Sequence, residues 1–162
     1  YNNINNFSLI NFVEQQMLYE SYVLGMNLNK INLSNNAQFV LPSGYNENSQ
    51  RIIAMNTGLT SAGANDFHFY VRCGNGSCSQ HGGTCSIWTH KPGLTNISCE
   101  LNSTVICDNN IAQLAYNAQI NSEPGVSTTY NTRPRFYTIQ LDTNPFNSSY
   151  SYDSSNDITY LN

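Results

Sequence analysis

A helical repeat near the start of the chain constrains the fold more than any other feature of the sequence. Between about Ser8 and Ile31, apolar residues recur at intervals of three, four or seven, which places them along one side of an α-helix. Glu14 and Glu20 fall on the remaining, polar side. We therefore predict one long helix over residues 8–31, and its broad apolar face requires a second layer such as a β-sheet. The predicted core face of this helix comprises Ile10, Val13, Met17, Leu24, Leu28 and Ile31.

After Pro42 the pattern changes from a helical repeat to the alternation that is typical of β-strands. The clearest strand covers residues 66–73, where Phe67, Phe69 and Val71 share one face and His68 takes the other. We expect His68 on the outer face of the sheet, as a strand residue rather than a catalytic base. Further strands are predicted at residues 51–55, 85–90, 97–101, 104–107, 135–142 and 158–161.

A short second helix is predicted near residues 110–120. Asn110 is a suitable N-cap, Ile111 and Leu114 begin an apolar face, and the pattern stops before Pro124. With 162 residues, the chain is long enough for one domain with a single core. The predicted fold class is α+β: a pilin-like, long N-terminal helix packed on an antiparallel β-sheet with disulfide-bridged loops. We expect one globular domain over residues 1–162, with the sheet region at 45–162.

The five cysteines are confined to the central third of the chain. In an oxidising compartment such a cluster indicates disulfides. A turn at residues 102–104 would set Cys99 opposite Cys107 on two antiparallel strands, at a distance that a disulfide can span. A four-residue loop would likewise set Cys73 opposite Cys78. Cys85 is left over in this scheme and is an alternative partner for either member of the second pair.

A metal site is the other interpretation of the same segment. Cys73, Cys78, His81, Cys85 and His90 form a C-x4-C-x2-H-x3-C-x4-H pattern, which offers soft ligands to zinc. The spacing fits none of the usual structural zinc patterns. We therefore predict no metal and no cofactor.

Composition and motifs argue against two further classes of function. The net charge is −4, and the six basic residues are scattered except for Arg133 and Arg135, which give too little basic surface for nucleic acid. Cys85 and His90 are conceivable as nucleophile and base, but a bridged cysteine has no thiolate. The sequence has no G-x-S-x-G motif, phosphate loop or paired acidic motif. We predict that the chain is not an enzyme and does not bind nucleic acid.

Two short stretches, taken with the predicted helix and sheet, resemble the type IV pilins. Residues 107–116 (CDNNIAQLAY) are similar to the C-x5-Q-L-A motif of the PilV-like minor pilins, the pilus modification proteins, and residues 16–32 resemble their helix. Residues 133–139 (RPRFYTI) resemble a strand of the PilX-like minor pilins. Asn117 stands where the first group has an acidic residue.

This resemblance implies a structural or assembly subunit of a type IV pilus, which promotes pilus biogenesis and has a role in adhesion. Its partners would be other pilin subunits, contacted through the N-terminal helix. An upstream apolar segment, absent from this sequence, would anchor the subunit in the inner membrane before assembly. The implied location is the bacterial cell surface or pilus, with a periplasmic or inner-membrane pool.

A secreted or surface carbohydrate-binding or adhesin module is the alternative function. Tyrosine and asparagine side chains recognise hydroxyl-rich ligands, and both are abundant here. A host-surface or glycan ligand would then contact the tyrosines of the C-terminal third. These are Tyr130, Tyr137, Tyr150, Tyr152 and Tyr160.

Overall fold

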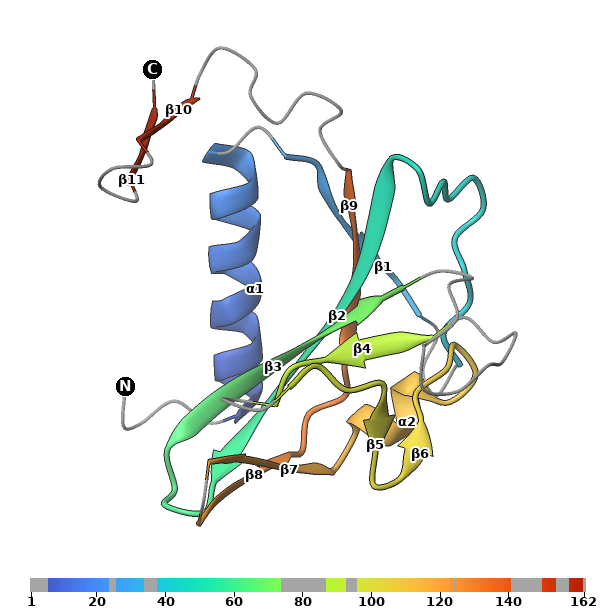
Figure 1. Cartoon of the computed structure of the whole chain (residues 1–162), viewed down its shortest axis with the longest axis vertical. Coiled ribbons are helices and arrows are strands. Elements are labelled where there is room, and N and C mark those ends of the chain that lie inside the picture. Colours follow the sequence, from blue (N-terminus) through green and yellow to red (C-terminus); the bar gives the residue numbers. More distant parts are fainter. Residues whose placement is uncertain are drawn as a thin grey trace.

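The computed structural model describes residues 6–23, 26–33, 38–73, 87–92, 96–123, 125–140, 150–153 and 158–161. Among its described residues, β-strands predominate over helices, and most of the strands form one large antiparallel sheet. The helix α1 stands alongside this sheet, and the short helix α2 lies near the β5–β6 hairpin (Figure 1). The elements in chain order are α1 (Asn6–Val23), β1 (Leu28–Ile31), β2 (Gln50–Thr60), β3 (Asn65–Arg72), β4 (Trp88–His90), β5 (Glu100–Leu101), β6 (Thr104–Val105), α2 (Ile111–Ala115), β7 (Ala118–Glu123), β8 (Val126–Tyr130), β9 (Arg135–Gln140), β10 (Tyr150–Asp153) and β11 (Ile158–Leu161).

The large sheet is organised around the long strand β2. Its order is β1-β9-β2-β3-β4, and all of these neighbours are antiparallel. The first half of β2 pairs with β9, whereas Leu59 and Thr60 at its far end pair with β8, which in turn pairs with β7. Two further pairs, β5 with β6 and β10 with β11, form separate two-stranded sheets.

The two faces of the sheet carry cores of very different size. On the face turned toward α1, Ile10 of the helix packs with Met55 and Tyr137 in a small buried cluster. Neighbouring residues in the strands point to opposite faces, so Ala54 and Phe136 belong to the other side. There they join the main core, to which α2, β5, β7 and β8 also contribute.

The predicted fold class is wrong. The structure is a mostly-β fold with a large antiparallel sheet and short helices, and not a long helix packed on a sheet. Helix α1 ends at Val23, well short of the predicted end at Ile31, and the main core lies on the face of the sheet away from it. The sequence pattern located the helix but overstated its length and its share of the core. The division into a single domain over residues 1–162 stays a prediction.

The predicted core face of the first helix mixes residues from two elements. Ile10 is buried, and Val13 and Met17 pack against the same cluster. Leu28 and Ile31 lie in β1 instead of the helix, three positions apart, so they point to opposite faces of the sheet. Leu28 packs on the α1 side and Ile31 against the main core. Leu24 lies outside the described residues.

The second helix is shorter than predicted. It begins at Ile111, with Asn110 at the N-cap position, but ends at Ala115. Asn117 has a positive φ of 61°, which breaks the helical path. The following residues, which the sequence pattern assigned to the helix up to about 120, form β7 and pair with β8.

Strand β3 was predicted in the right place but with the wrong face inward. His68 and Tyr70 are buried, as is Arg72, so the expectation that His68 lies on the outer face is wrong. Phe67 and Val71 are the exposed residues of this strand. Both faces of β3 carry aromatic residues, so the alternation alone could not indicate which side the second layer covers.

Among the described residues, no helix combines the length and apolar character that crossing a membrane requires.

Candidate functional site

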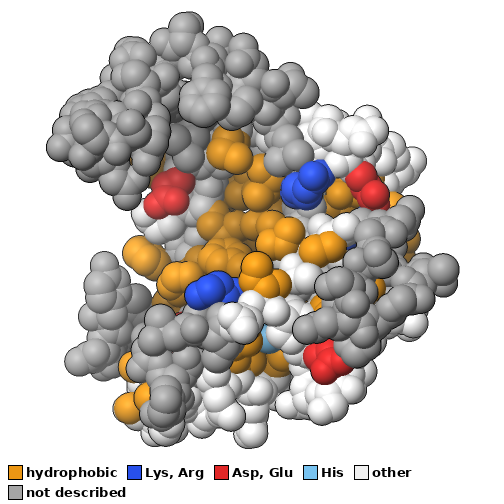
Figure 2. Space-filling view, in the orientation of Figure 1, with side chains coloured by type: hydrophobic (Ala, Val, Ile, Leu, Met, Phe, Trp, Pro, Cys, Tyr) orange, Lys and Arg blue, Asp and Glu red, His pale blue; other side chains and the backbone are white. Residues whose placement is uncertain are grey.

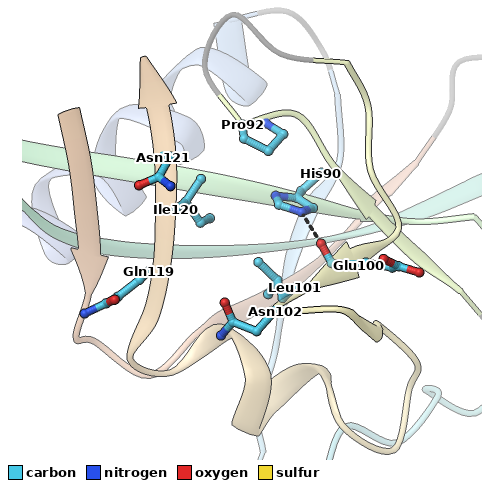
Figure 3. A pocket seen from close by; sticks show the side chains of 8 residues that line it. All are labelled: His90, Pro92, Glu100, Leu101, Asn102, Gln119, Ile120 and Asn121. Carbon is cyan, nitrogen blue, oxygen red and sulfur yellow. Dashed lines mark hydrogen bonds between the residues drawn. The ribbon is translucent and has the colours of Figure 1, made fainter. Parts of the chain in front are cut away.

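A shallow cavity of about 180 Å³ lies between strand β7 and the segment that joins β4 to β5. Figure 3 shows its walls. Ile120 points from β7 toward His90, and Pro92 and Leu101 add further apolar groups to a lining that is otherwise polar. Asn102, at the tip of the β5–β6 hairpin, is a polar residue at the rim, and Gln119 and Asn121 of β7 also line the cavity. The volume suits one small side chain or ring and is well below that of a drug-sized pocket.

His90, a buried polar side chain of this lining, is paired with a second buried histidine. Nε2 of His68 and Nδ1 of His90 are 2.8 Å apart, and Nε2 of His90 is 3.0 Å from the carbonyl oxygen of Glu100. A carbonyl only accepts, so His90 Nε2 carries a hydrogen and donates it to Glu100. In a neutral imidazole the other nitrogen is then an acceptor. His68 therefore donates from Nε2 to Nδ1 of His90.

This arrangement favours two neutral imidazoles. Burial, together with the neighbouring His90, lowers the pKa of His68 to about 4, and the charge of Asp66 only partly offsets these effects. Burial also lowers the pKa of His90, against the hydrogen bond to Glu100. Both nitrogens of His90 are engaged, so neither is available to take a proton from a molecule in the cavity. The pair joins β3, β4 and β5 through these two hydrogen bonds.

The aromatic residues around the histidines are part of the core. His68 packs edge to face on Tyr70 at 4.9 Å between ring centroids and lies 5.2 Å from the ring of Tyr130. The hydroxyl of Tyr130 donates to Asp66 across 2.6 Å. Burial and the carboxylate of Asp66 raise the pKa of Tyr130, which therefore stays protonated.

The tyrosine surface that the sequence suggested for a glycan ligand is not present as predicted. Tyr130 and Tyr137 are both buried, and neither is available to a ligand in solvent. The side chains of Tyr150, Tyr152 and Tyr160 lie outside the described residues.

The two predicted disulfides are wrong. Cys73 and Cys107 carry thiols, which rules out both the Cys99–Cys107 and the Cys73–Cys78 bridge. Cys99 is disulfide-bonded, and its partner is therefore neither Cys73 nor Cys107. Cys78 and Cys85 lie outside the described residues.

The Cys99–Cys107 pairing fails because the hairpin has a shorter turn than predicted. Leu101 pairs with Thr104 across a two-residue turn in which Asn102 and Ser103 both have positive φ, 50° and 61°. Positive φ at both central residues is typical of the tight type I′ hairpin turn. The register moves by one residue, so the carbonyl of Cys99 accepts from the backbone N–H of Ile106 instead of facing Cys107.

Of the alternative metal ligands, Cys78, His81 and Cys85 lie outside the described residues. Within the described part of the chain, no group of three or more His, Cys, Asp or Glu side chains could hold a metal ion.

The inner side of α1 is fixed to the sheet by a buried carboxylate that the helical pattern had assigned to the polar side. Glu14 accepts hydrogen bonds from Tyr137, across 2.8 Å, and from Arg135, and its Oε1 lies 2.6 Å from Nζ of Lys30. Burial by itself would raise the pKa of Glu14, but the contacts with Lys30, Tyr137 and Arg135 outweigh it and lower the pKa. The partners come from β1 and β9, at a distance in sequence that no local pattern can indicate.

The outer side of α1 is apolar and exposed. Phe12, Tyr19 and Val23 are 43%, 64% and 44% exposed. Together with Gln16 they are spaced by four, three and four residues, which is the spacing of a helix–helix seam. Ile10, Val13 and Met17, which face the sheet, lie on the other side of the helix. Figure 2 shows hydrophobic side chains gathered across the middle of the molecule, with the charged side chains separate from one another.

Comparison with known proteins identifies no relative: no family model, no curated protein and no solved structure matches this chain. The resemblance to type IV pilins therefore stays a prediction.

Proposed function

We propose that this chain is a structural subunit of a surface fibre, of the type IV pilus class that its sequence resembles, and that it packs against neighbouring subunits through the outer side of α1. The proposal rests on the helix and not on the predicted fold class. The observation that carries it is the exposed row of Phe12, Gln16, Tyr19 and Val23, which we call the outer seam.

The outer seam has the chemistry of a protein contact. It contains no charged residue, and its aromatic side chains provide large apolar areas at little cost in conformational entropy. The carboxylate of Glu14, one of the two in α1, is turned inward and paired with Lys30 and Arg135. An uncharged seam with heptad-like spacing is matched best by another helix of the same kind, and so the proposed partner is the corresponding helix of a neighbouring subunit.

The disulfide of Cys99 supports the proposed location. Disulfides persist in oxidising compartments such as the periplasm and the cell surface and are rare in the reducing cytosol.

The test is to place a charge in the outer seam and measure fibre assembly. Tyr19→Glu, in the full-length protein expressed by its own cells, should leave the domain folded because this side chain is exposed. It should remove the protein from sheared fibres, because an unpaired carboxylate buried in a helix–helix contact costs several kcal/mol. Immunogold electron microscopy and blotting of the sheared fraction measure the loss.

The matched control is Val40→Glu, a similar change at a residue that is 68% exposed and lies outside the helix. This variant should enter fibres as the wild type does. If Tyr19→Glu and Phe12→Glu enter fibres as efficiently as Val40→Glu, the proposed contact is wrong. If the wild-type protein is absent from every sheared fibre fraction, the proposed function itself is wrong.

A further inference from the structure

Strand β7 has one paired edge and one open edge. It pairs with β8 along residues 118–123, and among the described residues no strand pairs with its other side. An unpaired edge presents backbone N–H and C=O groups that a further strand can bind. The cavity described above lies beside this open edge, because Gln119, Ile120 and Asn121 all contribute to its wall.

The pairing of β8 determines which groups of β7 point outward. The backbone N–H of Ser61, just after β2, donates to the carbonyl of Ser127, so Ser127 faces β2. Alternate residues of an antiparallel strand face opposite neighbours, so Thr128 faces β7, where its partner is Ile120. The backbone groups of Gln119 and Asn121 therefore point away from β8.

These outward groups have no hydrogen-bond partner among the described residues. Gln119 and Asn121 are two positions apart, and each offers one N–H and one C=O. An extended chain also presents the backbone groups of every second residue to one side, so its spacing matches that of Gln119 and Asn121. The complementary ligand is thus another extended backbone.

The cavity beside the edge adds a site for a side chain. Ile120, Leu101 and Pro92 form an apolar part of its lining, Glu100 and Asn102 belong to the polar part, and the two nitrogens of His90 are already engaged. With a volume of about 180 Å³, it has room for one side chain, and an aliphatic one would contact the apolar part of the lining.

We propose that the open edge of β7 binds an extended peptide segment of a partner protein by strand addition, with one aliphatic side chain of that segment in the neighbouring cavity. Backbone hydrogen bonds to Gln119 and Asn121 supply the affinity, and the cavity selects the side chain. The edge is suited to this role because Gln119, Ile120 and Asn121 include neither proline nor lysine, the residues that commonly block a free edge. This proposal is independent of the outer seam of α1.

The probe is a capped, uncharged peptide, acetyl-Thr-Val-Thr-Leu-Thr-Val-amide, titrated into the ¹⁵N-labelled chain and followed by NMR. On binding, the amide protons of Gln119 and Asn121 should shift downfield and exchange more slowly with solvent. A peptide with alanine in place of the central leucine should bind more weakly, because it leaves the cavity empty. A peptide with N-methyl groups at alternate positions should bind at least about tenfold more weakly, because it cannot donate to the edge.

Two variants at one position separate backbone recognition from side-chain recognition. Gln119→Pro removes an N–H that points away from β8, so the β7–β8 ladder is kept while peptide binding falls at least about tenfold. Gln119→Ala keeps this N–H and should bind the peptide at least about tenfold more tightly than Gln119→Pro does. The proposal is overturned if the edge amides do not respond to millimolar peptide, or if Gln119→Pro binds as tightly as the wild type. If Gln119→Pro does not fold, the N-methylated peptide decides: binding equal to that of the parent peptide overturns the proposal.

Discussion

His68 donates a hydrogen bond to His90 inside the protein, with 2.8 Å between Nε2 of the first ring and Nδ1 of the second. The rings meet edge to face, 5.0 Å apart at their centroids. Protonation of His90 at Nδ1 would remove the acceptor, and protonation of His68 would place a charge in a buried site. The folded structure therefore requires that both rings be neutral.

This pair predicts a loss of stability in mild acid. The pKa of His68 is about 4 in the folded protein, against an ordinary value of 6.5 for histidine, so the unfolded chain binds more protons between these two pH values. Stability consequently falls as the pH falls through this window. Between pH 7.5 and 5, the contribution of His68 should lower the free energy of unfolding by about 2 kcal/mol. Urea unfolding at the two pH values measures it, and equal stability would contradict the prediction.

Glu14→Gln should weaken the attachment of α1 to the sheet. The substitution removes the negative charge that Lys30 and Arg135 share and leaves two cations close together. We expect a loss of about 2 kcal/mol in the free energy of unfolding at neutral pH. Because its folded-state pKa is lowered, the contribution of Glu14 is present above its unfolded pKa and is lost as the pH falls through the folded one.

The matched control is Glu20→Gln on the exposed side of the same helix. It should change the free energy of unfolding by no more than about 0.5 kcal/mol. Equal effects of the two substitutions on chemical unfolding would show that the contacts of Glu14 do not stabilise the fold.

Gly58→Ala should be severely destabilising. A Cβ at this position would lie 2.0 Å from the carbonyl oxygen of Thr129, where β8 joins β2, and a backbone atom cannot move away as a side chain can. The expected loss is at least about 3 kcal/mol, measured by thermal or urea unfolding. Gly63→Asn is the control: it has φ +78° and open space, so it should cost under about 1 kcal/mol. Wild-type stability of Gly58→Ala would refute the close approach of the two strands.

Peptide mapping should show thiols at Cys73 and Cys107. In denaturant without reductant, iodoacetamide should alkylate both residues but not Cys99, which becomes reactive only after reduction. In the native protein, the exposed Cys73 should react faster than the partly buried Cys107. Recovery of a linked peptide containing Cys99 and Cys107 would contradict the observed register of the β5–β6 hairpin.

Several strands were predictable because their signals are local. The alternation at residues 66–73 marks β3, and the short apolar run at 51–55 falls within β2. Pro134 directly precedes β9, as its restriction to the start of a strand suggests. The helical repeat from Ile10 to Met17 also corresponds to the side of α1 that contacts the sheet.

The candidate sites were not predictable in the same way. The β7 edge was hidden because residues 118–120 continue the apolar pattern of α2, and only the pairing with β8 makes them a strand. The histidine pair joins residues 22 positions apart, and the partners of Glu14 lie on β1 and β9. Asn102 could have indicated the tight turn at Asn102 and Ser103, because asparagine tolerates positive φ better than most residues.

The sequence by itself determined which residues share a side of each element, because side-chain direction follows the local repeat of a helix or strand. It could not determine which of the two sides faces inward. On β3, Phe67 and His68 point in opposite directions, and only the placement of α1 and of the second layer left Phe67 exposed and His68 buried. Burial depends on what covers each face, and those covering elements come from distant parts of the chain.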